Sequence, residues 1–421
     1  MLSRFIAAAV LAALCLSLVG CYGSKESDSV AYVQIIGVDV AAGGKRKITT
    51  QIAVPLSTSK GGGPPGTEEK AGTSKRWVFN TMLVSAPAEE ANLLRSTMSR
   101  SPRESHVSVV IFSEEIARQG LGPDATQYIR NRDYRETLFM LVVTGTAEDY
   151  MKHNNPALES SISKYYELFF EKASETGTYL PSTLHEFYTR LKTPGASPYA
   201  AYTGINPMTG IANPVDHKQP EQKADAYLPG GIPRTGTENP AEFSGLVVFR
   251  ADKMVGVLNS YETRAVAILQ NKLPLGYIAV VDPLKPEKDM INLAIRCEYT
   301  KITADLDGGM PIFNAEVKID GDIYGISSDI NYEAPGNREI LEQQIADFLK
   351  GQITAMLKHT QELGTDPVGF GLYLRPKFAN TNELNEANLT ELYQAADINI
   401  NVIVKIRRSG LIWRTVPLLK E

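Results

Sequence analysis

NREILEQQIADFLKGQITAMLKHTQEL, residues 337–363, is the longest stretch of this chain with a helical hydrophobic repeat. Its apolar residues recur at steps of three and four, which puts them on one face of an amphipathic helix. We expect Asn337 to be the N-cap of this helix and Gly364 to end it. The apolar face predicts packing on a core through Ile340, Leu341, Ile345, Phe348, Leu349, Ile353, Met356 and Leu357.

Strand-like segments lie on both sides of this helix. After it we expect a second helix near 384–395 and a strand over 397–407. The strand prediction rests on apolar residues that alternate with mostly polar ones, the period of a half-buried strand: Ile398, Ile400, Val402, Val404 and Ile406. Before the long helix we expect four strands, near 277–281, 290–304, 310–320 and 322–332.

Toward the N-terminus, β-rich runs form hairpins between short helical segments. Residues 30–40 pair with 47–54, and 243–250 with 254–258, across short turn segments. We expect further strands at 76–84, 107–112 and 138–144, and helices at 87–99, 114–119, 124–131, 146–153, 158–173 and 260–272. Hairpins with segregated helices predict an α+β fold with mixed or antiparallel sheets flanked by helices, rather than a doubly wound parallel sheet.

Residues 204–240 differ in composition from both of their neighbours. Eleven of these 37 residues are Gly or Pro, and Tyr227 is the only aromatic residue among them. That composition is typical of a linker or a long surface excursion. We therefore expect an N-terminal domain over 21–203, a linker or loop over 204–240 and a C-terminal domain over 241–421.

The first twenty residues have the pattern of a lipoprotein signal peptide. Arg4 supplies the positive end, and residues 5–18 form an apolar run that is too short and too rich in alanine for a good transmembrane helix. The run ends in Leu18-Val19-Gly20-Cys21, which has the form of a bacterial lipobox. We expect cleavage between Gly20 and Cys21. The alternatives are an ordinary signal peptide and a membrane anchor with an incidental cysteine.

Lipid attachment is expected at Cys21, because its thiol is the nucleophile that forms a thioether with diacylglycerol. Diacylglycerol supplies two acyl chains, the number that stable anchoring requires. The mature chain is therefore expected to be held on the outer face of a membrane. No stretch after Cys21 has the ~18 apolar residues of a transmembrane span.

Charge and cysteine content exclude several classes of protein. The net charge is −5, and removing residues 1–20 with Arg4 makes it −6, which argues against a nucleic-acid-binding protein. The cysteines are Cys15, Cys21 and Cys297, so the mature lipidated chain has no pair left for an intrachain disulfide. The same count excludes a four-cysteine zinc site.

The sequence lacks the common catalytic motifs. It has no G-x-S-x-G elbow and no Walker lysine, and the Gly-rich loop at 61–66 contains two prolines. Glu114-Glu115 is expected at a solvated helix start. The five histidines are scattered and form no metal spacing: His106, His153, His185, His217 and His359. We predict no catalytic residue, no metal site and no cofactor, and therefore a binding or structural protein rather than an enzyme.

Two groups of basic residues are candidate anion or lipid contacts. Arg130, Arg132 and Arg135 are interleaved with Asp133 and Glu136, which favours an ordinary charged surface. The second group could face anionic lipid headgroups, but we expect it to lie on a solvated strand edge. It lies near the C-terminus and consists of Lys405, Arg407, Arg408 and Arg414.

Several motifs in order along the chain resemble one family. They are Gly20-Cys21, Ile36-Gly37-Val38-Asp39 with Lys47-Ile48-Thr49-Thr50-Gln51, Ser101-Pro102 with Ser105-His106 and Ser113-Glu114-Glu115-Ile116-Ala117, Phe243 to Phe249 with Asp252 to Gly256 and Leu258-Asn259-x-x-Glu262-Thr263-Arg264, and Asp366 to Gly371. The set resembles the Ger(x)C family, the lipoprotein C subunits of spore germinant receptors in endospore-forming bacteria. The resemblance covers nearly the whole mature chain.

The resemblance implies a non-catalytic receptor subunit in three subdomains, with lipidation at Cys21 alone. It implies two integral membrane partners, the A and B subunits, at the spore inner membrane, and it leaves contact with the small-molecule germinant open. The chain departs from the family pattern at three places. It has Tyr22-Gly23 where Trp-Asp is usual, and Ala265 where a glycine tends to follow the Glu-x-Arg motif. It also has the charged pair Arg103-Glu104 where an aromatic residue is common. The segment 204–240 is also longer than usual.

Two other functions share the lipobox. A solute-binding lipoprotein of an importer predicts strand–helix–strand alternation and a ligand cleft, and the hairpin-rich pattern disagrees with that alternation. A lipid-anchored hydrolase predicts a nucleophile with a base or a metal set, and the sequence shows none.

Overall fold

The structure is a computed structural model, and it describes residues 1, 4–6, 29–54, 76–85, 87–207, 226–234, 239–287, 289–412 and 414–416. The predicted lipobox, the Gly-rich loop and most of 204–240 lie outside these residues. Within the described ranges, no helix is long and apolar enough to cross a bilayer.

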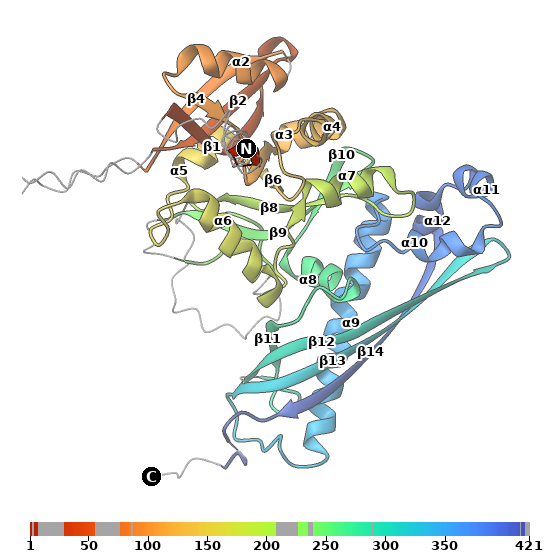
Figure 1. Cartoon of the computed structure of the whole chain (residues 1–421). Coiled ribbons are helices and arrows are strands. Elements are labelled where there is room, and N and C mark those ends of the chain that lie inside the picture. The colour runs from red at the N-terminus through yellow and green to blue at the C-terminus, as the bar shows by residue number, and fades with distance from the viewer. Residues whose placement is uncertain are drawn as a thin grey trace, which may run out of the picture.

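One large sheet contains ten strands and fills the upper part of the molecule (Figure 1). Its strands are β1 (Val30–Val40), β2 (Arg46–Ala53), β3 (Trp77–Val84), β4 (Ser101–Arg103), β5 (Val109–Ser113), β6 (Phe139–Val143), β7 (Ser182–Thr183), β8 (Tyr199–Ile205), β9 (Ala241–Arg250) and β10 (Lys253–Leu258). Eight of them lie in the order β10-β9-β8-β6-β5-β1-β2-β3, while β4 pairs with β1 and β7 with β6. A 3₁₀ turn over Ala42–Gly44 joins β1 to β2.

The middle of the large sheet is parallel. Strands β1, β5, β6 and β8 run in the same direction, with Ile36 beside Val110, Val110 beside Met140 and Val142 beside Tyr202. Parallel neighbours need crossover connections, which the hairpin-rich sequence pattern did not predict. Each of the two later crossovers carries two or three short helices instead of one long helix, so no clean strand–helix–strand alternation is visible in the sequence.

Helices cover both faces of this sheet. On one face α3 (Glu114–Gln119), α4 (Gly122–Arg130) and α7 (Leu184–Lys192) share a core with Ile36 and Val38, and α2 (Pro87–Thr97) joins them through Leu94. On the other face α5 (Ala147–His153) and α6 (Ile162–Glu171) share a core with Ile35 and Ile111. A 3₁₀ turn over Lys172–Glu175 extends α6. The alternation of Ile35 and Ile36 between two cores follows from the two-residue period of a strand.

The second sheet is long and narrow and has four strands (Figure 1). These are β11 (Gly276–Val281), β12 (Met290–Asp307), β13 (Met310–Ile326) and β14 (Asp397–Arg408), in that spatial order. Strands β11, β12 and β13 are antiparallel, and β14 runs parallel to β13. Gly308 and Gly309, with φ of 57° and 88°, form the tight turn between β12 and β13, where positive φ favours glycine.

The long helix α9 (Asn337–Leu363) packs against β14 and confirms the predicted bounds. Gly364 ends it with a left-handed φ of 63°, as expected. The expected N-cap is wrong by one residue, because Gly336 occupies that position and Glu339 accepts a hydrogen bond from its N–H at 2.5 Å. Asn337 instead donates its side-chain amide to the carbonyl of Asn331 at 3.0 Å.

Two element predictions in the C-terminal half are wrong. The segments 310–320 and 322–332 are not two strands, because β13 runs through Gly321 to Ile326 with only a local register shift against β14. The expected helix near 384–395 is two helices, α11 (Thr381–Glu386) and α12 (Leu389–Ala395). Asn388 separates them, since its side chain caps α12 by accepting from the N–H of Glu391 at 3.3 Å. The short helix α10 (Gly371–Leu374) and a 3₁₀ turn over Arg375–Lys377 precede them.

Helix α8 (Ser260–Leu269) joins the two sheets into one core. Val266 and Ile268 contact a cluster that contains Leu246 and Val248 of β9 together with residues of the second sheet and α9. The predicted mixed and antiparallel sheets flanked by helices are therefore confirmed. Strands β8 and β9, which flank the segment 204–240, pair directly in the large sheet. The domain boundaries and the number of subdomains stay predictions.

Candidate functional site

The predicted lipid site lies outside the described residues. Gly20 and Cys21 belong to the range 7–28, so cleavage between them and lipidation of Cys21 stay predictions. Cys297, on β12, is partly buried, and burial raises the pKa of its thiol.

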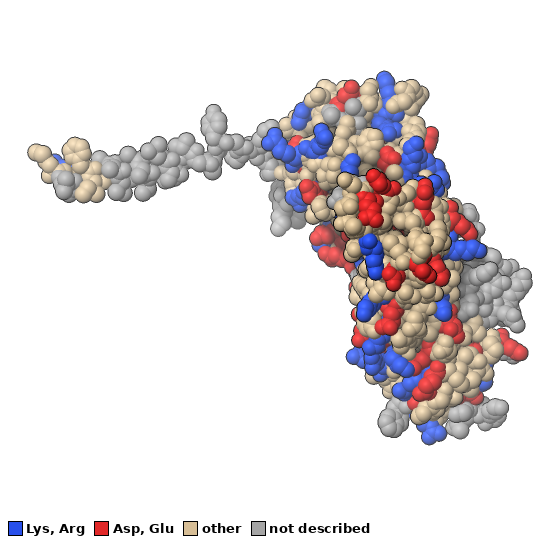
Figure 2. All heavy atoms as spheres, turned by 90° about the vertical axis from the view of Figure 1, so that its right-hand side faces the viewer, with Lys and Arg blue, Asp and Glu red and all other residues tan. Residues whose placement is uncertain are grey.

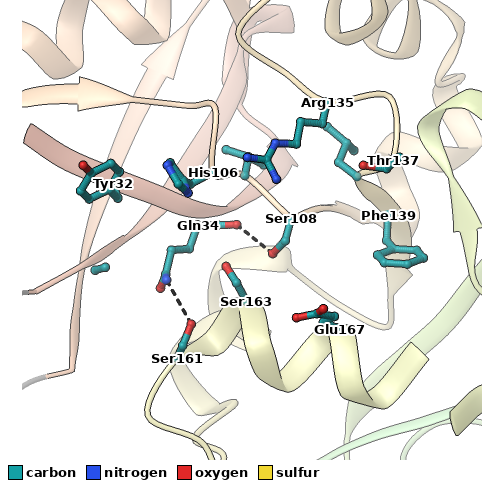
Figure 3. A pocket seen from close by; sticks show the side chains of 13 residues that line it. Tyr32, Gln34, His106, Ser108, Arg135, Thr137, Phe139, Ser161, Ser163 and Glu167 are labelled. Atoms are coloured by element: carbon teal, nitrogen blue, oxygen red, sulfur yellow. Dashed lines mark hydrogen bonds between the residues drawn. The ribbon is translucent and has the colours of Figure 1, made fainter. Parts of the chain in front are cut away.

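A cleft of about 620 Å³ lies at the amino ends of the parallel strands β1, β5 and β6 (Figure 3). The first turns of α6 close one side of it, and the loops before β5 and β6 close the other. This position is opposite to the carboxyl-end crevice that open parallel sheets use for ligands. The residues that line it are Tyr32, Gln34, Ala53, His106, Val107, Ser108, Arg135, Thr137, Leu138, Phe139, Ser161, Ser163 and Glu167.

Gln34 holds three elements together at the floor of the cleft. Its backbone carbonyl accepts hydrogen bonds from the N–H of Ser108 at 2.9 Å and from the Ser108 hydroxyl at 3.3 Å. Its side-chain amide donates to the hydroxyl of Ser161 at 3.3 Å (Figure 3). Because Ser161 is the N-cap of α6, this contact fixes the start of that helix beside β1.

The rim of the cleft carries two basic side chains. His106 packs edge-on against Tyr32, with ring centroids 4.7 Å apart. Arg135 extends from the loop before β6 toward His106 (Figure 3) and is exposed, and no carboxylate in the described part of the chain pairs with it. Glu167, on the second turn of α6, is paired with Lys164 at 3.0 Å.

No catalytic constellation is formed by the described lining residues. His106 makes no hydrogen bond to a serine hydroxyl of the cleft, so no nucleophile is paired with a base there. Within the described ranges, no three His, Cys, Asp or Glu side chains are grouped to hold a metal ion. The groups present can bind and orient a ligand by hydrogen bonds.

The predicted histidines do not gather at one place. His106 lines the cleft, while His153 lies 3.3 Å from Asp149 and His185 lies 3.3 Å from Glu136 on exposed surface. His359 of α9 contacts Glu262 of α8 at 2.7 Å, and this pair helps to join the two helices. His217 lies outside the described residues.

Three of the predicted charged residues form ion pairs with described neighbours. Glu114 accepts from Arg118 at 2.5 Å and from the hydroxyl of Tyr202 at 3.1 Å, while Glu115 is exposed. Near the C-terminus, Lys405 pairs with Glu342 at 2.7 Å, and Arg407 pairs with Asp320 at 2.9 Å. On the face shown in Figure 2, basic and acidic side chains are interspersed. Of the three arginines at 130, 132 and 135, only Arg135 lines the cleft.

Residues in the family-like motifs hold elements in place across the fold. Asp39 at the end of β1 accepts from the N–H groups of Ala147 and Glu148 at 2.7 and 3.0 Å, and so caps α5. Gly37 lets α5 approach, because a Cβ at this position would lie 2.5 Å from the sulfur of Met151. Asn259 and Glu262 form the capping box of α8.

Asp366 organises the turn that links the two sheets. Its carboxylate accepts from the N–H groups of Gly369 and Gly371 at 2.7 and 2.9 Å. Its own N–H donates to the hydroxyl of Ser197, 2.9 Å away, just before β8. Burial raises the pKa of Asp366 to about 6, although the backbone N–H groups oppose this shift.

A buried acid pair beneath α2 was not predicted as unusual. Glu90 lies in the first turn of α2 and is 1% exposed, and one of its side-chain oxygens has no hydrogen-bond partner in the described part. Burial, and then the charge of nearby Glu104, raises the pKa of Glu90 to about 8. Burial also raises the pKa of Glu104. No local sequence signal marks this pair, since the residues are brought together by the packing of α2.

Comparison with known proteins agrees with this fold over almost its full length. The family described as spore germination protein N-terminal domain matches residues 23–205, and the one described as spore germination B3/GerAC like, C-terminal, matches residues 244–410. The chain belongs to the Ger(x)C family. This Ger(x)C chain is 24% identical to YfkR of Bacillus subtilis (strain 168), over 96% of each chain.

Other relatives carry names that refer to spore germination. Spore germination protein GerQC of Bacillus cereus is 22% identical, over 94% of this chain and 96% of GerQC. Spore germination protein KC of Bacillus subtilis (strain 168) is 21% identical, over 93% and 92% of the two chains. The crystal structure of the GerBC protein aligns with a TM-score of 0.53 at 16% identity, covering 88% of this chain and 96% of GerBC, and shows that the fold is shared.

Proposed function

We propose that this chain is the lipid-anchored, non-catalytic C subunit of a nutrient germinant receptor. It acts in spore germination at the outer face of the spore inner membrane, beside the integral membrane A and B subunits. The observation that carries the proposal is the pair of family matches, which together extend from residue 23 to residue 410 in the expected order. The names of the relatives support the role in germination.

The proposed anchor is a diacylglycerol on Cys21. The lipobox residues Leu18 to Cys21 support it, and two acyl chains suffice for stable attachment. An anchor raises the effective concentration of the attached domains near membrane partners, without any new contact between the proteins. The mature chain then contributes binding surfaces, and the described cleft offers hydrogen-bonding groups rather than a nucleophile paired with a base.

The test compares Cys21→Ala with Cys15→Ala in spores that carry each variant as the only copy of the gene. Cys15 lies in the predicted signal peptide six positions earlier, so it is a matched control that leaves the lipobox intact. We expect Cys21→Ala to lower germination through the cognate receptor to the level of the gene deletion, and Cys15→Ala to behave as wild type. Mass spectrometry of the membrane fraction checks that only the control carries the diacylglycerol.

An unchanged germination response in the gene deletion would overturn the receptor assignment. Normal germination in Cys21→Ala, with the chain free of lipid, would overturn the anchoring proposal and leave the receptor assignment in place. Co-purification of the A and B subunits with a tagged chain tests the proposed partners separately.

A further inference from the structure

The described residues that line the cleft include one unpaired cationic side chain, Arg135. Arg135 at the rim has no carboxylate partner in the described part of the chain, and His106 beside it donates to no side chain there. Among the described lining residues Glu167 is the only acid, and it forms an ion pair with Lys164 at 3.0 Å. The local charge balance therefore favours a negatively charged ligand at the Arg135 side.

The start of α6 adds a second positive feature on the opposite wall. This helix has ten residues, and Ser161 caps it by accepting from the N–H of Lys164. The N–H groups of Ile162 and Ser163 have no partner within the described residues, so the positive end of the helix dipole faces the cleft (Figure 3). Helix starts of this kind bind carboxylates and phosphates.

Ser163 supplies an independent sign of a missing partner. Its hydroxyl oxygen is buried on the wall of the cleft and makes no hydrogen bond to any described residue. A buried polar group that is left unpaired destabilises the fold, so folded proteins usually provide it with a partner. Because solvent does not reach this oxygen, a ligand oxygen near the start of α6 would pair with it only after the Ser163 side chain rotates toward the cleft.

The remaining walls are apolar and too extensive for an inorganic ion alone. Val107, Leu138 and Phe139 line the cleft beside the polar groups, and the cavity of about 620 Å³ lies in the range of small-molecule sites. We propose that the cleft binds a small organic anion, with its carboxylate or phosphate between Arg135 and the start of α6 and its apolar body against Phe139. This site goes beyond the receptor role and does not depend on the lipid anchor.

The test is calorimetric titration of the purified full-length chain with four probes: benzoate, phenyl phosphate, benzamide and inorganic phosphate. We expect at least one of the two aromatic anions to bind about tenfold more tightly than neutral benzamide and than inorganic phosphate. The tighter of benzoate and phenyl phosphate identifies the anionic group that the cleft prefers.

Three variants assign the binding to this cleft. Arg135→Gln is expected to weaken the preferred anion about tenfold, and Arg135→Lys is expected to keep most of the affinity, because it keeps the charge. Arg132→Gln is the matched control, since Arg132 is exposed in the same loop and does not line the cleft. The proposal would be overturned if benzamide or inorganic phosphate bound as tightly as the preferred aromatic anion, or if Arg135→Gln kept full affinity for that anion. So would an absence of binding by both aromatic anions.

Discussion

The buried carboxyl groups of Asp366 and Glu90 differ in how far hydrogen bonds stabilise their ionised form. Asp366 is surrounded by backbone N–H groups that stabilise its ionised form, and its pKa rises only to about 6. Glu90 accepts no such hydrogen bond from the described residues, lies near the second acid Glu104, and has a pKa of about 8. At neutral pH Glu90 is therefore mainly protonated in the folded protein and ionised when the chain unfolds.

Replacing Glu90 with Gln is expected to stabilise the protein increasingly as pH rises. A carboxyl whose folded pKa is raised contributes stability below its unfolded pKa of about 4.5, and that contribution is lost as pH rises through about 8. Glu90→Gln removes this loss, so the stability of the variant relative to wild type should rise by on the order of 3 kcal/mol between pH 5 and pH 8. Urea unfolding at both pH values measures the difference.

Glu115→Gln is the control for this prediction, because Glu115 is exposed on α3 and its substitution should change the free energy of unfolding equally at pH 5 and pH 8. A Glu90→Gln variant with the same pH dependence as wild type would show that Glu90 is not the titrating group.

At the scale of elements, long periodic segments were predictable and interrupted ones were not. The stripe from Ile340 to Leu357 predicted α9 within its observed bounds, because its helical repeat is unbroken, although Ile340 itself is exposed and not part of the core. The predicted separation of 310–320 from 322–332 is wrong, because pairing with β12 and β14 continues across residue 321. The parallel centre of the large sheet was not predictable, since which strands lie side by side depends on pairing over long sequence separations.

The cleft, like the parallel centre of the sheet, could not be predicted from local sequence. His106 and Arg135 were considered individually from the sequence, yet their meeting with Ser163 requires β1, two loops and the start of α6 to assemble. Gln34 and Ser161, whose contact forms its floor, are 127 residues apart. No local spacing encodes such an arrangement, whereas helix caps such as Asn259 with Glu262 are local and can be recognised.

Two glycines next to or within α9 are expected to respond in opposite ways to alanine. Gly351 is helical and exposed, and a Cβ there would meet no atom within 4 Å, so Gly351→Ala should raise stability by about 0.5–1 kcal/mol. Gly336 has equal space but a φ of +87°, so Gly336→Ala should lower stability by about 1 kcal/mol. Thermal unfolding of both variants beside wild type checks the signs, and a shift of both in the same direction would contradict the backbone explanation.

At the scale of the whole molecule, the parts on either side of 204–240 share one sheet and one core. Phe243 belongs to the core beneath α5 and α6, and Val247 and Phe249 belong to the core on the other face. Strand β8 is buried along almost its whole length between β6 and β9. The large sheet therefore needs residues from both predicted domains to cover its apolar strands.

We expect a chain split between residues 207 and 239 to fold only when both pieces are present. In a separate piece with residues 21–207, one edge of β8 and parts of two apolar cores would be exposed to solvent. This piece should therefore show no cooperative thermal transition. Co-expressed with residues 239–421, the piece should form a stable complex with a single transition. Circular dichroism and size-exclusion chromatography distinguish these results, and cooperative unfolding of the first piece alone would show that it is an autonomous domain.

The direct pairing of Ile205 with Ala241 at the ends of β8 and β9 also tells an engineer where to add sequence. Both ends of the connecting segment lie at neighbouring positions in the sheet, so the expected cost of lengthening the connection is the entropy of closing a longer loop. This entropy grows slowly, by about 0.6 kcal/mol for each doubling of the length. An epitope tag or a fluorescent reporter inserted between 208 and 225 should therefore be tolerated, which would let the protein be followed in living spores without altering either terminus.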